Sequence, residues 1–195
     1  MNQKKNQRFQ ETDNRICSCF IELLSRKEMS RITVNEICGS VGINRSSFYL
    51  HYADVYALLA KVMEGAVKEM LADFTDIAED NRMYFSRPYL LVLLRHVKKD
   101  AVLYRAYLEH VGMAEIEKGY QSLFSGLFKP YFRMLGMESE HVMEYYFTFA
   151  TNGFTAVLRK WLSYGCEESV DDIADIILRS MAPIPEGLPD MSDIT

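Results

Sequence analysis

The chain has 195 residues, of which 49% are hydrophobic and 12% aromatic, so it can bury a core. It contains no run of about 18 or more apolar residues and no apolar stretch near the N-terminus, so we expect neither a membrane span nor a signal peptide, and a cytoplasmic protein. The four cysteines do not form the framework of a secreted disulfide-rich domain, which indicates reduced, mostly buried thiols.

The formal net charge is −5, but the charge is unevenly distributed. Residues 1–56 carry eight Lys or Arg against six acidic residues, a balance of +2, and the remainder carries −7. Asymmetry of this kind is a modest indication that the N-terminal part meets nucleic acid while the rest keeps the molecule soluble.

Glycine and proline are scarce, and apolar residues recur at spacings of three and four, which predicts an all-α fold of about nine helices. We expect these helices over 12–25, 33–41, 45–52, 55–79, 88–99, 101–110, 114–134, 139–164 and from 169 onward. Asp100 can cap the helix that follows it. Pro130 should kink or end the helix over 114–134.

The short N-terminal helices carry local signals at their ends. Thr33 and Glu36 match a capping box, in which both side chains satisfy free N–H groups at a helix start. Gly42 follows the second helix, where a left-handed residue is needed. Asn44 and Asp54 can cap the next two helices. The residues expected to face inward are Ile16, Phe20, Ile21 and Leu24, then Val34, Ile37, Cys38 and Val41, then Phe48 and Tyr52.

A supporting helix followed by two short helices with a glycine turn is the arrangement of a helix-turn-helix DNA-binding unit. Cys38 supplies a small buried residue where the two helices cross. Gly42 forms the turn, and Ile43 supplies an apolar side chain that fills the space beneath it. The alternative is an ordinary pair of adjacent helices, which is common in all-α proteins.

The N-terminal end of the helix over 45–52 carries the candidate DNA contacts. Arg45 could reach guanine or a phosphate, and Ser46 could reach base edges or the backbone. Tyr49 and His51 would lie toward the phosphates. Leu50 is either a contact to a thymine methyl group or an exposed leucine of no consequence.

The run TVNEICGSVGINRSSFYLHYADVYALL closely resembles the N-terminal domain of the TetR family of transcription regulators. The resemblance implies a phosphate contact for Thr33 and core positions for Phe48 and Tyr52. The recognition positions that it implies are Arg45, Ser46, Ser47, Tyr49 and His51.

Two positions depart from the family's pattern. Val55 stands where members often have a phosphate-contacting lysine, and Leu50 where the family is frequently polar, so the preferred DNA sequence is not carried over. Lys4, Lys5 and Arg8 form either an arm entering the minor groove or a solvated tail.

The resemblance also implies a division of the chain. We expect a helix-turn-helix domain over 1–56, an effector-sensing and dimerisation domain of helices over 57–182, and a disordered tail over 183–195. The helices over 139–164 and from 169 would pair with their copies in a second subunit. The expected interface residues are Phe149, Gly153, Val157, Trp161, Ile173 and Ile177. The alternative is that the apolar faces of both helices are buried within a single chain as its internal core.

Aromatic residues between these regions could line an apolar effector pocket, or an ordinary core. The candidates are Phe74, Tyr89, Tyr104, Tyr107, Phe124 and Phe128. An enzyme is not predicted, because di-iron chemistry in a helical bundle uses two Glu-x-x-His motifs and this chain has one, from Glu138 to His141. We predict no cofactor and no metal site.

These patterns together predict a DNA-binding transcriptional regulator that acts as a homodimer on a palindromic operator. Family base rates favour a repressor, which a small-molecule effector would release by moving the long helix over 55–79. The alternative is an activator or adaptor of the same fold that is controlled by a partner protein.

Overall fold

The computed structural model describes residues 2–74, 86–112, 116, 118–121, 124–134 and 136–181. All regular structure within these ranges is helical, without a β-strand, which confirms the predicted all-α class. The α-helices are α1 (Asn2–Arg26), α2 (Val34–Val41), α3 (Arg45–His51), α4 (Val55–Asp73), α5 (Arg87–Lys99), α6 (Ala101–His110), α8 (Lys129–Met134), α9 (Glu140–Ser163) and α10 (Val170–Met181). A 3₁₀ turn, η1 (Met29–Arg31), follows α1, and a π-helical turn, η4 (Phe124–Phe128), precedes α8.

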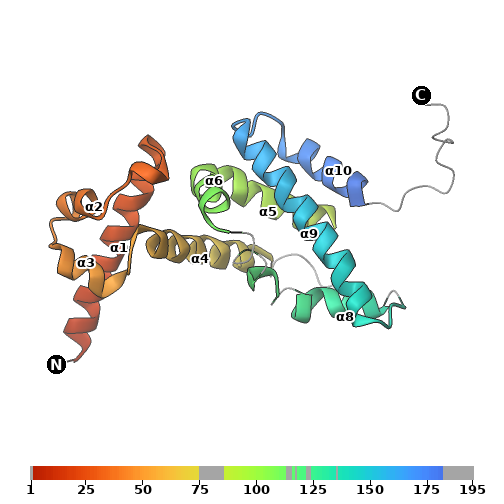
Figure 1. The fold of residues 1–195 in the computed structure, drawn as a ribbon, viewed down its shortest axis with the longest axis horizontal. Coiled ribbons are helices and arrows are strands. Elements are labelled where there is room, and N and C mark those ends of the chain that lie inside the picture. The colour runs from red at the N-terminus through yellow and green to blue at the C-terminus, as the bar shows by residue number, and fades with distance from the viewer. Residues whose placement is uncertain are drawn as a thin grey trace.

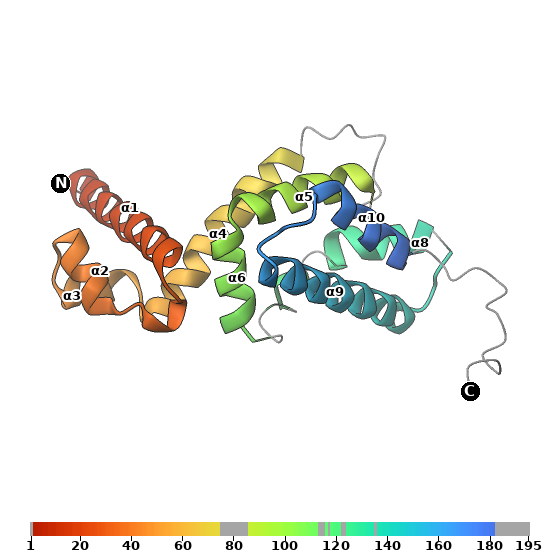
Figure 2. The ribbon, with the colours of Figure 1, turned by 90° about the horizontal axis from the view of Figure 1, so that it is seen from above.

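The helices gather at two ends of an elongated molecule (Figure 1). Helices α1 to α3 lie together at one end, and α4 leads from them to the larger group formed by α5, α6, α8, α9 and α10 (Figure 2). Helix α10 packs mainly against α5, and α6 packs against both α4 and α9. Among the residues placed here, no helix combines the length and apolarity that crossing a bilayer requires.

The predicted capping signals are present at the short helices. Thr33 Oγ1 accepts the N–H of Glu36 at 3.3 Å, and Asn44 Oδ1 accepts the N–H of Ser47 at 2.7 Å. Asp54 caps α4 in the same way. The Glu36 carboxylate, however, pairs with Lys27 in place of the helix start, so half of the predicted capping box forms.

Three predictions about helix boundaries and faces are corrected. Helix α1 begins at Asn2, and Thr12 is an interior residue whose hydroxyl donates to the Arg8 carbonyl at 2.9 Å, so the basic N-terminal residues belong to a helix instead of an arm or tail. Ile21 is 49% exposed, because Phe20 and its neighbours one turn away already fill the inward stripe. Asp100 makes no side-chain capping bond.

Other boundaries agree where the structure describes them. Helices α5, α6 and α9 fall where the spacing predicts them, and Ser169 caps α10 by accepting the N–H of Asp172 at 3.1 Å. The chain widens into the π-helical turn η4 just before Pro130, which has no N–H to continue an α-helical ladder. The predicted end of the fourth helix near Glu79 and the predicted tail over 183–195 lie outside the described residues.

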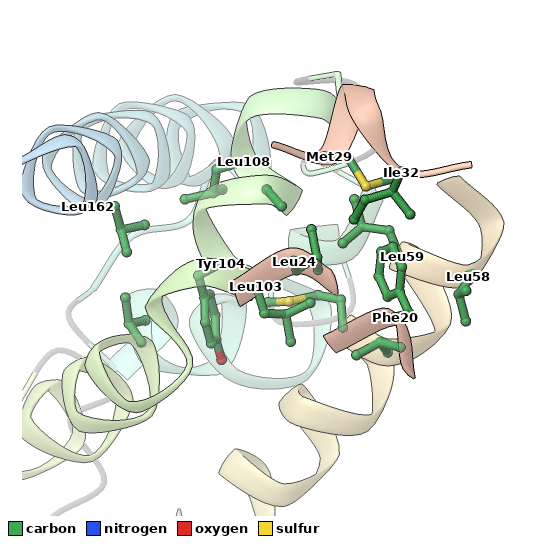
Figure 3. Packing of buried hydrophobic residues seen from close by; sticks show 14 of the residues in the cluster. Phe20, Leu24, Met29, Ile32, Leu58, Leu59, Leu103, Tyr104, Leu108 and Leu162 are labelled. Carbon is green, nitrogen blue, oxygen red and sulfur yellow. The ribbon is translucent and has the colours of Figure 1, made fainter. Parts of the chain in front are cut away.

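One hydrophobic cluster runs through both ends of the molecule. Leu24 and Met29, from α1 and η1, belong to this cluster together with Leu103 and Leu108 of α6 (Figure 3). A second, smaller cluster joins η4 and α8 to α9, and its buried members are Phe124, Phe128, Phe132, Met143 and Phe147. The N-terminal helices therefore do not rest on an isolated core.

Gly42 has a positive φ of 73°, and its N–H donates to the Cys38 carbonyl at 2.9 Å, which ends α2. We expect Gly42→Ala to lower the free energy of unfolding by about 1 kcal/mol or more, because a side chain is strained in the left-handed region. Gly39→Ala, within the same helix and with open space around its Cβ, should raise it by up to about 1 kcal/mol. Urea unfolding measures both, and equal effects would contradict the assignment of the turn.

Candidate nucleic-acid interface

Helices α2 and α3 form the expected helix-turn-helix and rest on α1. Ile37 and Phe48 are fully buried between the helices, and Tyr52 is 7% exposed at the C-cap of α3. Arg15 of α1 donates to the Val41 carbonyl at the C-terminal end of α2. One face of α3 is thus fixed, and its opposite face is left open.

The recognition end of α3, which we define as Arg45, Ser46, Ser47, Tyr49 and Leu50, lies on that open face. Ser47 is half-buried and the other four are exposed, with Tyr49 at 47% and Leu50 at 77%. The side chains predicted to meet DNA, apart from His51, therefore reach the surface together. Leu50 faces outward, as predicted.

Arg45 and Tyr49 are linked to each other. Arg45 Nη2 donates to the Tyr49 hydroxyl at 3.1 Å, and the guanidinium lies 5.8 Å from the centre of the tyrosine ring. The hydrogen bond to Tyr49 raises the pKa of Arg45 above its ordinary value. The pair presents a fixed positive charge beside an aromatic ring, which suits a phosphate or the edge of a guanine.

Thr33 is exposed at the start of α2, where its oxygen accepts the Glu36 N–H. A threonine hydroxyl that accepts one hydrogen bond can also donate one. Thr33 therefore has its predicted role as a helix cap, and its contact to a phosphate stays a prediction.

His51 departs from the prediction that it contacts DNA. Its side chain is only 4% exposed, and Nδ1–H donates to Asp13 Oδ1 at 3.0 Å. The Phe9 ring stacks on the imidazole with centroids 3.9 Å apart. Sequence reasoning missed Asp13 and Phe9, because their spacing of four on one helix shows a shared face but not what that face meets.

The predicted dimer residues divide into two groups. Phe149 is 77% exposed, Gly153 is exposed and Val157 is half-buried. The other three are buried inside the chain, so they are not available to a second subunit, and that part of the prediction is corrected. They are Trp161 at 2%, Ile173 at 4% and Ile177 at 2% exposure.

The division has a geometric cause. Residues four apart on an α-helix are rotated by about 40°, so the series from Phe149 to Trp161 turns by about 120° from the surface into the core. Trp161 Nε1–H donates to the Glu168 carbonyl at 3.3 Å, which fixes the ring inside. Toward the start of α9, the exposed face continues through large side chains. They are Val142, Tyr145 and Tyr146, at 43%, 76% and 56% exposure.

The six predicted pocket residues make separate contacts within the described part of the chain. The rings of Phe74 and Tyr89 lie 5.1 Å apart, whereas Phe124 and Phe128 pack against Phe147 in the smaller cluster. A hollow of about 620 Å³ opens beside η4 and α8, and it is lined by Ser125, Lys129, Pro130, Arg133 and Met134.

The remaining pocket candidates lie on α6. Tyr104 is buried in the main cluster, and its hydroxyl donates to Met70 Sδ at 3.9 Å. Burial and the nearby Asp100 carboxylate raise the pKa of Tyr104 to about 12. Tyr107 is half-buried one turn away. Both therefore join the packing between helices, and their place in the lining of an effector pocket stays a prediction.

Comparisons with known proteins identify the family and the fold of the chain. A TetR family model described as "Transcriptional regulator C-terminal region" matches residues 86–182, about half of the chain. No curated protein is significantly similar in sequence.

Solved structures share the fold over most of the chain. A TetR transcriptional regulator from Streptococcus agalactiae 2603V is 22% identical, with a TM-score of 0.66, over 93% of this chain and 99% of that one. Thermus thermophilus FadR, a TetR family repressor in complex with lauroyl-CoA, is 16% identical, with a TM-score of 0.60, over 90% and 100%. The dihydroxyacetone kinase operon activator DhaS is 18% identical, with a TM-score of 0.54, over 87% and 93%.

At these identities the solved structures establish the fold, and the family model carries the assignment. The model covers the C-terminal half, and the motif over residues 33–59 lies in the N-terminal half. The chain therefore belongs to the TetR family of DNA-binding transcriptional regulators, and the prediction that it is not an enzyme is confirmed with it.

Proposed function

We propose that this regulator binds a palindromic operator as a homodimer and represses transcription until an effector binds among its C-terminal helices. The observation that carries the proposal is the recognition end of α3, whose side chains are exposed while the opposite face, through Phe48, is fully buried. A helix held in this way can enter a major groove with its N-terminal residues leading.

The proposed division follows the predicted boundaries, with DNA binding over residues 1–56 and effector sensing and dimerisation over residues 57–182. Helix α4 begins at Val55 and joins the two parts. A displacement of α4 would change the separation of two recognition helices in a dimer. An effector can drive that change only if it binds the two arrangements with different affinity. The cytoplasm, where a bacterial-type regulator meets the chromosome, is the proposed location.

The exposed face of α9 supports the homodimer. Tyr145 and Phe149 stand one turn apart at 76% and 77% exposure, and the exposed Gly153 beyond them permits close approach of another helix. An apolar helix face of this kind is costly to leave in water. A second copy of α9 would cover it through the same residues, as a two-fold interface requires.

An activator is the second candidate. The likeness to the dihydroxyacetone kinase operon activator favours it, and so does the scatter of the predicted pocket residues. The likeness to a repressor bound to lauroyl-CoA supports a small-molecule effector with an apolar chain. Transcription of a reporter behind the operator, with and without the protein, separates repression from activation.

Selection of bound DNA from random-sequence fragments tests the proposed operator. We expect an enriched palindrome whose half-sites are centred about one helical turn or a multiple of it apart. Enrichment of a single half-site, or of no sequence, would contradict the proposed dimer on a palindrome.

Arg45→Ala is expected to weaken binding to the selected duplex by about tenfold to a hundredfold, because a bidentate guanine contact contributes about 1–3 kcal/mol. Tyr49→Phe should cause a smaller loss, since it removes only the hydroxyl that orders Arg45. Fluorescence anisotropy measures both affinities, and light scattering checks that the dimer persists. Arg95→Ala, which removes the same charge from an exposed position on α5, is the matched control. Unchanged affinity in both α3 variants would refute the recognition end.

A further inference from the structure

Helix α1 presents three side chains to the C-terminal end of α3. Phe9, Asp13 and Cys17 are spaced by four residues, so they share one face of α1. Each of them contacts His51 or Tyr52, the last residue and the C-cap of α3. We call this set of five residues the α1–α3 clamp.

Asp13 is the centre of the clamp. Its Oδ1 accepts the Tyr52 hydroxyl at 2.7 Å and His51 Nδ1–H at 3.0 Å. The Asp13 side chain is 18% exposed and that of His51 is 4% exposed, so water competes little for these bonds. One carboxylate oxygen thus holds two consecutive residues at the end of the recognition helix.

The two flanking residues restrict the partners of Asp13. Phe9 stacks on the His51 ring with an interplanar angle of 16°, which prevents the imidazole from turning outward. Cys17 Sγ lies 3.4 Å from the Tyr52 hydroxyl oxygen. Burial, followed by the hydrogen bonds to Cys17 and Asp13, raises the pKa of Tyr52 well above its ordinary value, so the hydroxyl remains a donor.

We propose that Asp13 is a positioning residue for DNA recognition, which sets the angle of α3 on α1 through His51 and Tyr52. The inference rests on the proposed role of the recognition end in reading DNA. Helix α3 has only seven residues, too few to be stable without its neighbours, so its orientation depends on contacts such as these. Tyr49 lies only two residues before His51, and Arg45 is bonded to Tyr49, so a tilt of the clamped end moves both side chains.

The direction in which DNA affinity changes when the Asp13 carboxylate is removed separates a positioning role from simple electrostatic repulsion. A carboxylate near a DNA-facing helix repels phosphates, so its removal should strengthen binding if it had no other role. The clamp predicts the opposite result for Asp13, because loss of the acceptor frees His51 and Tyr52. Glu11 lies two residues away on α1, and it is exposed and accepts a hydrogen bond from Gln7 in its own helix. Its replacement therefore reports the electrostatic part of the effect.

The test measures affinities for the selected palindromic duplex and for a scrambled duplex of equal length. Asp13→Ala is expected to weaken binding to the palindrome by about tenfold or more, and to the scrambled duplex by less than about threefold, because non-specific binding depends on phosphates. Asp13→Asn retains Oδ1 as an acceptor and should remain within about threefold of the wild type. Glu11→Ala should bind both duplexes as tightly as the wild type, or more tightly.

Two further variants guard against loss of the fold. Tyr52→Phe keeps the buried ring and removes only the hydroxyl that Asp13 accepts, so it should show the same selective loss to a smaller degree. His51→Asn keeps a donor near Nδ1 and should leave the dependence of affinity on salt unchanged, whereas a lost phosphate contact lowers that slope by about 0.9.

The outcomes are distinguishable. If the wild type does not prefer the palindrome over the scrambled duplex, the proposed function fails. If the wild type prefers it but Asp13→Ala behaves as Glu11→Ala does, the positioning role of Asp13 is overturned. Equal losses for both duplexes in Asp13→Ala and Tyr52→Phe, or a lower salt slope in His51→Asn, would also overturn it.

Discussion

Replacing Phe48 with alanine is expected to lower the free energy of unfolding by about 3–5 kcal/mol and to abolish preference for the operator. Phe48 is fully buried, and its ring lies 5.7 Å from that of Tyr49 and 5.9 Å from that of Tyr52. Truncation removes the contacts that hold α3 against α2 and leaves a cavity in their shared core. Since α3 has only two turns, the loss of its one fully buried side chain removes a large share of its packing.

Leu50→Ala on the same helix provides the control for Phe48→Ala. Leu50 is 77% exposed, so its truncation should change stability by less than about 0.5 kcal/mol. Urea unfolding followed by circular dichroism gives both values, and anisotropy gives the DNA affinities. A Phe48→Ala protein with the stability of the wild type would show that α3 is held by other contacts. Loss of operator preference in Leu50→Ala without loss of stability would identify Leu50 as a contact to DNA.

The second large effect is expected from Phe149→Asp, which should convert the proposed dimer into a monomer and weaken operator binding by about a hundredfold or more. A two-fold interface contains each substitution twice, so two carboxylates would be brought together without partners in an apolar contact. A monomer reaches only one half-site at a time. Light scattering across a range of concentrations measures the oligomeric state.

Leu71→Asp is the matched control for Phe149→Asp. Leu71 is 45% exposed on α4, so the same change in charge and polarity falls on another helix. It should leave both the oligomeric state and the operator affinity as they are in the wild type. A Phe149→Asp protein that remains dimeric would move the interface away from the exposed half of α9.

Local sequence signals predicted the helix-turn-helix because its chemistry is local. Thr33, Asn44 and Asp54 each accept an N–H three residues later, and Gly42 has the positive φ that its position demands. These contacts span few residues, so the sequence order itself specifies them.

Contacts across the fold were not predictable in the same way. The partner of His51 is Asp13, 38 residues earlier in the chain, and nothing local to either residue indicates the other. Trp161 shows a related limit. Its spacing from Phe149 in steps of four predicted that both side chains share one face of α9. Each step rotates the position by about 40°, however, and Trp161 lies in the core. Periodicity identifies a face, and tertiary packing decides what covers it.

The contact between α1 and α6 limits how parts of two such regulators can be joined in one hybrid protein. The short link between His51 and Val55 joins α3 to α4. Judged by the order of the helices alone, a hybrid would be joined there, with the DNA-binding helices of one regulator and the C-terminal helices of another. Leu24 and Met29, which border the same small hollow as Val102 and Ala106 of α6, would then meet a foreign α6. A functional hybrid therefore needs α1, η1 and α6 from the same parent, or substitutions that restore the packing between them.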